Sequence, residues 1–195
     1  MKLFYAPGAC SLADHIALIA AGLDHETEKV DLKVKTTETG RDYRQINPKG
    51  YVPALELDDG QILTENIAVL LYIAHSSGKL MPQDFAKWRV IEMTAFISTE
   101  LHKNFKPLFD PQADDAARAK AKEIIGQRMA YVDSQLGGRD YVVGDALTIA
   151  DCYLFVMLIW CRRHDIKLPT RLVAYCHRID LLPPVVEAMT KEGLR

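Results

Sequence analysis

The pattern of apolar residues changes once along this chain, and that change limits the folds open to it. Over the first 77 residues, short strand-like runs alternate with runs of helical spacing. Beyond the small-residue and proline stretch Ser76–Pro82, no strand pattern of any length follows. We therefore predict a mixed α/β domain over residues 1–77, a linker over 78–83 and an all-helical domain over 84–195.

The first domain reads as a strand, a helix and a strand, followed by a hairpin and a closing helix. Asp58-Asp59-Gly60 carries the Asp-Gly signal of a tight turn between two antiparallel strands. The predicted order is β-α-β-α-β-β-α, in which the second helix is only a turn or two long. The predicted elements are strands at Leu3–Tyr5, Glu28–Leu32, Leu55–Leu57 and Gln61–Leu63, and helices at Leu12–Gly22, Asp42–Ile46 and Ile67–Ala74, with Thr36–Gly40 as polar loop.

Cys10 falls at the turn between the first strand and the first helix. The residues Ser11-Leu12-Ala13-Asp14 are typical of a capping box, which places Cys10 beside the positive end of a helix dipole. A thiol in that position tends to lose its proton more easily than a free cysteine does. The alternative is a small buried residue packed beneath the turn, since free cysteines are commonly buried.

The second domain reads as helices throughout. One long helix runs from Trp88 to Phe105 and is ended or kinked near Pro107, and a second spans Asp115–Leu136. The most apolar helix begins at Thr148-Ile149-Ala150-Asp151, another capping box, which we assign to folding rather than to chemistry. Two shorter helices, Leu172–Ile179 and Val185–Met189, follow.

Composition excludes several classes of function. Lys and Arg number 24 against 26 Asp and Glu, so the chain lacks the basic field that non-specific nucleic-acid binding needs. The four cysteines have neither CxxC spacing nor zinc-finger histidines, which argues against a structural metal and for reduced thiols in a cytoplasm. The longest apolar run, Cys152–Cys161, is half of the roughly 20 residues that a membrane span needs, and no secretory signal is evident.

Short motifs with a specific order and spacing span nearly the whole chain. They are Lys2–Tyr5 with Pro7–Leu12, Ile46–Gly50 with Val52–Leu55, Ile62–Glu65, Glu100–Lys103, Pro107–Phe109, and Gly144-Asp145 with Leu147–Asp151. Together they resemble the cytosolic glutathione transferases, and within them the bacterial beta class. The resemblance implies a thioredoxin-like first domain that holds glutathione and a helical domain that supplies most of the pocket for an electrophilic co-substrate. It also implies a homodimer, with glutathione as co-substrate and no further cofactor.

The resemblance assigns five glutathione-binding residues to the first domain's core motifs. Cys10 matches the beta-class cysteine, which lies next to the glutathione sulfur and can form a mixed disulfide with it. The Val52 backbone would pair with the cysteinyl part of glutathione, and Pro53 matches the family's cis-proline. Glu65 and Asn66 would take the γ-glutamyl end, at a helix start whose free amides also suit a carboxylate. An ordinary helix cap is the alternative at that position.

Further assignments from the resemblance reach other segments. Lys35 matches a residue that reaches the glycyl carboxylate, while His102 and Lys103 match positions that approach the thiol and the tripeptide from the helical domain. Ala95 and Thr99 depart from the amide and small hydroxyl residue expected one and two turns before the histidine, although Thr99 is kept as a binding candidate. Asn66 also departs, since many relatives have Ser or another small residue there.

Three of these residues have competing interpretations. Ser11 is the second candidate for the catalytic group, because other transferase classes use a serine near this position, but a thiol is the better nucleophile. His102 shares a predicted helix face with Trp88, so a partly buried histidine with a satisfied ring is its alternative. Trp160 lines the co-substrate pocket or packs in the core.

The sequence thus predicts a cytoplasmic, homodimeric glutathione transferase of a bacterial, detoxifying type. It would conjugate glutathione to hydrophobic electrophiles and exchange thiols and disulfides through Cys10, with His102 and Ser11 as the other catalytic candidates. Two alternatives are a thiol transferase or dehydroascorbate-type reductase, and a non-catalytic scaffold that binds apolar ligands or, as in the stringent-starvation relatives, contacts the transcription machinery. Cys10 together with Val52-Pro53 and Glu65 favours an enzyme, because a binding scaffold has no need of a thiol at that turn.

Overall fold

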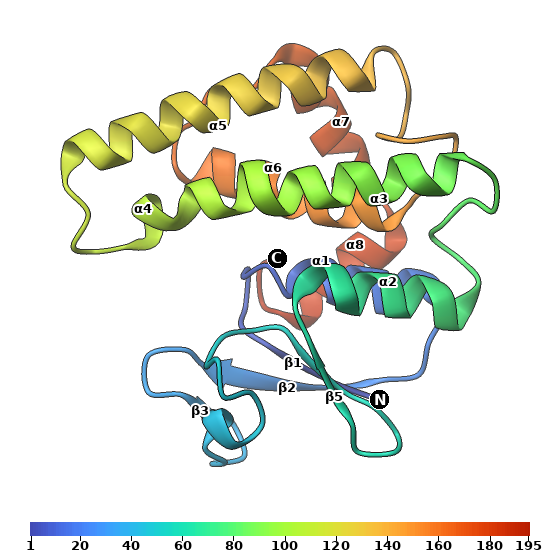
Figure 1. Ribbon diagram of the computed structural model, residues 1–195, viewed down its shortest axis with the longest axis vertical. Helices are drawn as coiled ribbons and strands as arrows, with labels where there is room; N and C mark the ends of the chain where they lie inside the picture. Colours follow the sequence, from blue (N-terminus) through green and yellow to red (C-terminus); the bar gives the residue numbers. More distant parts are fainter. The chain divides into compact units, whose positions relative to one another are not determined.

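The computed structural model describes all residues from 1 to 195 and builds its first unit on a five-stranded sheet (Figure 1). The strand order is β3-β2-β1-β4-β5, with β1 parallel to β2 and every other neighbouring pair antiparallel. The strands are β1 (Lys2–Tyr5), β2 (Glu26–Asp31), β3 (Thr36–Thr37), β4 (Ala54–Glu56) and β5 (Ile62–Thr64). The predicted mixed α/β class is confirmed. The polar loop predicted over Thr36–Gly40 is wrong in part, because β3 pairs there with the end of β2.

Alternation along β1 sends its side chains to two different layers. Phe4 packs on one face with Tyr43 of the short helix η1 (Tyr43–Gln45), in a buried cluster that includes Val30 and Val52. Tyr5 points to the other face, where its ring centroid lies 5.8 Å from that of His15 in α1. Helices α1 (Leu12–Ala21) and α2 (Asn66–Ser77) contact each other on that side of the strands (Figure 1).

The last helix joins this first unit. Contacts divide the chain into Met1–Met81 with Leu182–Arg195, and Pro82–Leu181, whereas the sequence predicts one helical domain over 84–195. Helix α8 (Pro183–Lys191) contacts α1 and buries Val185, Ala188 and Met189. An amphipathic pattern marks the apolar face of a helix without saying which element covers it, so the sequence alone could not assign α8.

The second unit is helical throughout, as predicted. Its central helix α6 is buried along almost its whole length, and it contacts α3, η2 and α7. None of the helices in the structure is both long and apolar enough to traverse a membrane. The elements are α3 (Ala86–Phe96), η2 (Ile97–Leu101), η3 (His102–Phe105), α4 (Lys106–Phe109), α5 (Asp115–Leu136), α6 (Ile149–Arg163) and α7 (Thr170–Asp180).

The predicted long helix from Trp88 to Phe105 is not continuous. After α3, the backbone widens to a π-helical turn in η2 and then tightens to a 3₁₀ turn in η3. The change therefore precedes Pro107, which sits in the first turn of α4, where a missing amide hydrogen costs little. The spacing of apolar residues does not reveal one extra residue in a turn, so the sequence predicted the end of the regular helix near Pro107 rather than after α3.

Candidate functional site

The turn that carries Cys10 connects β1 to α1. Gly8 adopts a left-handed conformation at φ 67°, which lets the chain reverse, and Ala9 N then donates to Ala6 O at 3.0 Å. Ala13 N donates to Cys10 O at 3.0 Å, so Cys10 already belongs to the first helical turn. The Cys10 side chain is 9% exposed, and its Sγ donates to Val52 O at 3.4 Å.

Two sequence expectations for this turn are wrong. Ser11 has a helical backbone, at φ −59° and ψ −17°, and its Oγ accepts from Ala6 N at 3.2 Å instead of capping α1. Burial raises the pKa of the Cys10 thiol, and the nearby negative charge of Asp14 adds to that shift. Hydrogen bonds from the Cys10 and Ser11 backbone act in the opposite direction and are outweighed. In the unliganded protein, Cys10 is therefore a protonated hydrogen-bond donor.

The segment that receives the Cys10 thiol is the loop before β4. The Val52-Pro53 peptide bond is cis, and Val52 itself is buried. The neighbouring Tyr51 carbonyl accepts from Tyr43 Oη at 3.0 Å and from Asn47 Nδ2 at 2.7 Å. Because these two bonds hold the carbonyl of the residue before Val52, they help to keep the Val52 backbone beside Cys10.

The start of α2 meets the same turn. Asn66 is buried, and its Nδ2 donates to Cys10 O at 3.1 Å, while its Oδ1 has no hydrogen-bond partner. Glu65 precedes it with a left-handed backbone at φ 77°. The Glu65 carboxylate accepts hydrogen bonds from Tyr51 Oη at 2.8 Å and from Lys49 Nζ. An exposed carboxylate and the free amides of a helix start thus lie next to the Cys10 turn.

Lysine side chains border this arrangement. Lys35, with a left-handed backbone at φ 60°, donates from Nζ to Gly50 O at 2.7 Å. Lys49 Nζ also donates to Thr64 Oγ1 at 2.9 Å. The sequence missed Lys49 and Tyr51 as site residues. Lys49 lies in the Ile46–Gly50 motif and Tyr51 lies between it and Val52–Leu55, and their pairing with Glu65 spans 14 to 16 residues.

The C-terminal segment also holds the Cys10 turn, which no sequence pattern indicated. The Glu192 carboxylate is buried, and its Oε2 accepts from Gly8 N at 2.9 Å. Its Oε1 lies 3.0 Å from His15 Nδ1. The bond to Gly8 spans 184 residues, beyond the reach of any local pattern.

Four predicted site residues belong to the second unit. Thr99 is exposed in η2 and donates from Oγ1 to Ala95 O at 3.1 Å, and Lys103 is exposed in η3. His102 is half-buried, and its Nδ1 lies 2.5 Å from Tyr153 Oη. Burial, with a smaller contribution from the positive charge of Lys103, lowers the pKa of His102 to about 4. His102 is therefore neutral at physiological pH.

Trp160 is the fourth, and its surroundings are aromatic. It is 5% exposed, and its ring meets His102, Phe105 and Phe109 edge-on at centroid distances of 5.1, 5.3 and 4.7 Å. These are the contacts of a packing residue, the alternative that the sequence left open. Its place in an electrophile pocket stays a prediction.

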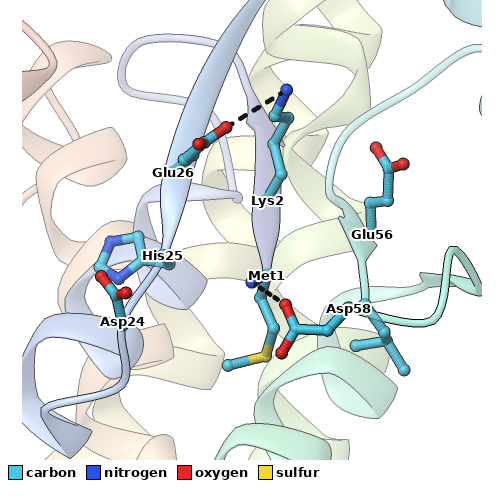
Figure 2. Close-up of a pocket in the computed structure, with 8 residues that line it drawn as sticks. Met1, Lys2, Asp24, His25, Glu26, Glu56 and Asp58 are labelled. Carbon is cyan, nitrogen blue, oxygen red and sulfur yellow. Dashed lines mark hydrogen bonds and ion pairs between the residues drawn. The ribbon is translucent and has the colours of Figure 1, made fainter.

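A pocket at the amino end of β1 contains none of the predicted residues (Figure 2). Two ion pairs lie within its lining: the Met1 amino group lies 2.6 Å from Asp58, and Lys2 lies 3.4 Å from Glu26. Cys10 follows the opposite, carboxyl end of β1. No group of three or more His, Cys, Asp or Glu side chains is placed to hold a metal ion.

Comparisons with known proteins agree along the whole chain. Residues 9–76 match the family model "Glutathione S-transferase, N-terminal domain", and residues 96–179 match "Glutathione S-transferase, C-terminal domain". The chain is 40% identical over 201 residues to Glutathione S-transferase GstA of Escherichia coli O157:H7, with all of both chains covered.

Solved structures give the same picture. A sphingomonad glutathione S-transferase complexed with glutathione is 45% identical, with a TM-score of 0.91 and all of both chains covered. A bacterial beta class glutathione S-transferase of Sphingomonas chungbukensis is 42% identical, with a TM-score of 0.92 and the same full coverage.

Proposed function

This chain belongs to the glutathione S-transferase family, and on that premise we propose that it conjugates reduced glutathione to electrophilic small molecules at the Cys10 turn. The observation that carries the proposal is the meeting of three segments at Cys10. Its thiol contacts Val52 O, its carbonyl accepts from Asn66, and both partners belong to segments that suit a peptide ligand. The full-length similarity to a transferase complexed with glutathione supports the same ligand.

Each proposed contact follows from a group of this chain. The amides at the start of α2 attract the γ-glutamyl carboxylate, and the exposed Glu65 carboxylate attracts the ammonium group beside it. The Val52 backbone pairs with the cysteinyl unit, and Lys35 attracts the glycyl carboxylate. The proposal adds Lys49. Its ammonium group already pairs with the Glu65 carboxylate, and its positive charge also suits a carboxylate of glutathione.

His102, Lys103 and Thr99 are the residues that the proposal assigns to the second unit. Lys103 is exposed, and its positive charge suits an anionic tripeptide or thiolate. His102 is neutral, so it acts on sulfur through a hydrogen bond and not through a charge. Thr99 keeps its hydroxyl on its own helix, which makes it the weakest of the three binding candidates.

The raised pKa of Cys10 has different consequences for its two proposed activities, because conjugation uses the thiol and exchange uses the thiolate. In conjugation, the buried thiol donates a hydrogen bond to the thiolate of glutathione, which attacks the electrophile. In thiol exchange, the Cys10 thiolate attacks one sulfur of glutathione disulfide, forming Cys10–S–S–glutathione and releasing one glutathione thiolate, which takes up a proton. Because burial disfavours the Cys10 thiolate, we expect exchange to be slow at neutral pH and to accelerate as the pH rises.

The test compares wild type with Cys10→Ala in conjugation of glutathione to a chromogenic aryl halide, and by intact mass after incubation with oxidised glutathione. We expect wild type to conjugate and to gain one glutathione, and Cys10→Ala to lose the adduct and at least about tenfold in kcat/KM. Cys176→Ala, which removes another buried thiol, is the matched control and should behave as wild type.

Two outcomes would change this proposal. A wild-type protein that neither conjugates glutathione nor gains the adduct would overturn it. Full activity in Cys10→Ala with loss in Ser11→Ala would move the catalytic role to Ser11. The homodimer, the cytoplasmic location and the hydrophobic nature of the electrophile stay predictions, and light scattering on the purified protein tests the first of them.

A further inference from the structure

Helix α6 presents two aromatic residues to His102. Tyr153 and Trp160 are seven residues apart, so they lie on the same face of the helix two turns from each other. The Tyr153 ring meets the His102 ring edge-on, with centroids 5.8 Å apart, and Trp160 does the same at 5.1 Å. One buried helix thus supplies two aromatic contacts to the imidazole.

The backbone change in η2 and η3 directs His102 to this face. The regular spacing of one long helix would place His102 on the face of Trp88, yet Trp88 is 59% exposed whereas His102 is half-buried. The π-helical turn over Ile97–Leu101 widens the helix and rotates the residues after it about the axis. A π turn is rare in helices and often occurs at a functional site. The contact that this turn allows His102 to make with Tyr153 is therefore a candidate for a functional role.

The chemistry of the contact with Tyr153 favours one proton arrangement. A neutral imidazole has one N–H and one nitrogen lone pair, and a phenol hydroxyl both donates and accepts. Tyr153 is fully buried, and its Oη lies 2.5 Å from His102 Nδ1, so the two atoms share a hydrogen. The phenol is the more acidic partner, which makes O–H to Nδ1 the favoured direction and leaves the imidazole proton on Nε2.

We propose that Tyr153 is a positioning residue that fixes His102 as its Nε2–H tautomer, so that His102 offers the glutathione sulfur a hydrogen-bond donor and not a base. This inference rests on the proposed function for its ligand, while the tautomer itself is a property of the free protein. The titratable groups next to the ring are Tyr153 from α6 and Lys103 from its own segment, while the indole ring of Trp160 packs against it. Neither supplies the negative charge that would draw a second proton onto the imidazole.

The chemical consequence is a division of roles. A neutral Nε2–H donor stabilises a thiolate sulfur without taking up its proton, whereas a base would need the Nε2 lone pair free. The low pKa of His102 agrees with a ring that stays neutral during turnover. We therefore expect the pH dependence of conjugation above about pH 5 to come from glutathione and not from His102.

The first experiment reads the tautomer directly. Nitrogen NMR of the free protein, labelled at histidine and assigned with His102→Gln, distinguishes a protonated from an unprotonated nitrogen at each ring position. We expect His102 in wild type to carry its proton on Nε2, and Tyr153→Phe to give a mixture of tautomers. A wild-type proton on Nδ1, or an unchanged spectrum in Tyr153→Phe, would overturn the proposal whether or not the protein is a transferase.

The second experiment tests the donor role in conjugation. We expect Tyr153→Phe to lose roughly tenfold in kcat/KM for glutathione, because His102 then presents its Nε2 proton to the sulfur less often and in a less fixed orientation. His102→Gln, which keeps an N–H donor, should retain more activity than His102→Ala. Equal loss in both would overturn the donor role. Failure of wild type to conjugate at all would refute the proposed function and leave the tautomer result standing.

The matched control is Tyr175→Phe. Tyr175 is an equally buried tyrosine of the same unit, and its hydroxyl donates to Asp151 and not to His102. We expect Tyr175→Phe to lower the thermal midpoint while leaving the His102 spectrum and kcat/KM unchanged. If both tyrosine variants altered the His102 tautomer alike, Tyr153 would have only a structural role and the proposal would fail.

Discussion

Each unit of this protein starts a buried helix with a hydroxyl residue three positions before an aspartate, and the two starts are built differently. In the second unit, Thr148 is extended, at φ −124° and ψ 170°, and a capping box forms with Asp151. Asp151 Oδ2 accepts from Thr148 N at 2.9 Å and from Thr148 Oγ1 at 2.6 Å. Its Oδ1 accepts from Val142 N at 2.8 Å and from Tyr175 Oη at 2.7 Å.

In the first unit, the equivalent aspartate is left without partners. Ser11 is already helical and bonds to Ala6, and both carboxyl oxygens of Asp14 are buried with no hydrogen bond. Burial raises the pKa of both aspartates. Four donors oppose that shift at Asp151, whereas at Asp14 only its own backbone amide opposes it and the nearby negative charge of Glu192 adds to it. The same pair of residue types thus forms a capping box in the second unit but not in the first, where the helix start carries Cys10.

The largest expected effect is the loss of stability when the hydrogen-bonded carboxylate of Asp151 is removed. Asp151→Ala leaves the Val142 amide and the Tyr175 hydroxyl buried without an acceptor, and we expect it to lower the free energy of unfolding by about 4 kcal/mol. Urea unfolding at pH 7 measures it. Asp145→Ala, at an exposed aspartate of the same loop, is the control and should stay within about 0.5 kcal/mol of wild type. A loss under about 1 kcal/mol in Asp151→Ala would contradict the network.

The next largest expected effect is a difference in coupling energy between the two motifs, measured by double-mutant cycles. We expect Thr148→Ala and Asp151→Ala to be coupled by about 1–2 kcal/mol, because each removes the other's hydrogen-bond partner. Ser11→Ala and Asp14→Ala should add to within about 0.5 kcal/mol, because their side chains do not bond. Urea unfolding of all six variants gives both coupling energies, and equal couplings would erase the distinction between the units.

The smallest expected effect is a pH-dependent gain at Asp14. Its pKa is raised in the folded state, so the folded protein binds the proton more tightly, and stability falls as the pH rises above the unfolded value of about 3.9. Asp14→Asn removes this dependence, and we expect its stability relative to wild type to rise by about 1 kcal/mol between pH 4 and pH 7.

Urea unfolding at both pH values measures the difference, with Asp151→Asn as the control. That variant replaces one of the two acceptor oxygens with an NH2 donor, which leaves two of the four donors at Asp151 without an acceptor, so it should be less stable than wild type at both pH values. A relative stability of Asp14→Asn that does not change between pH 4 and pH 7 would show that Asp14 is ionised in the folded protein.

Several features of the fold follow from local sequence and are confirmed. The Asp-Gly hairpin joins β4 to β5, α5 spans Asp115–Leu136 as predicted, and the capping box at Thr148 starts α6. In each case the decisive groups are within a few residues of one another, so no distant partner has to be known. The strand-to-helix turn at Cys10 was located for the same reason.

The site depended on more distant partners. Nothing near Cys10 in the sequence indicates its hydrogen-bond partners. Val52 O accepts from its thiol, Asn66 donates to its carbonyl, and Glu192 accepts from the preceding turn. The resemblance to a known family selected Cys10, Val52, Glu65 and His102 as site residues, but it could not supply the pKa of either Cys10 or His102. Those values depend on burial, which is set by elements far away in the chain.

The sequence by itself located most of the helices and strands, because caps, turns and apolar periods act over a few residues. Only the tertiary structure decided that Ser11 bonds to Ala6 and leaves Asp14 unpaired, that α8 joins the first unit, and that Tyr153 meets His102. The physical reason is that a polar side chain takes the partner that burial leaves available. That choice is made when distant segments pack, after local geometry has been set.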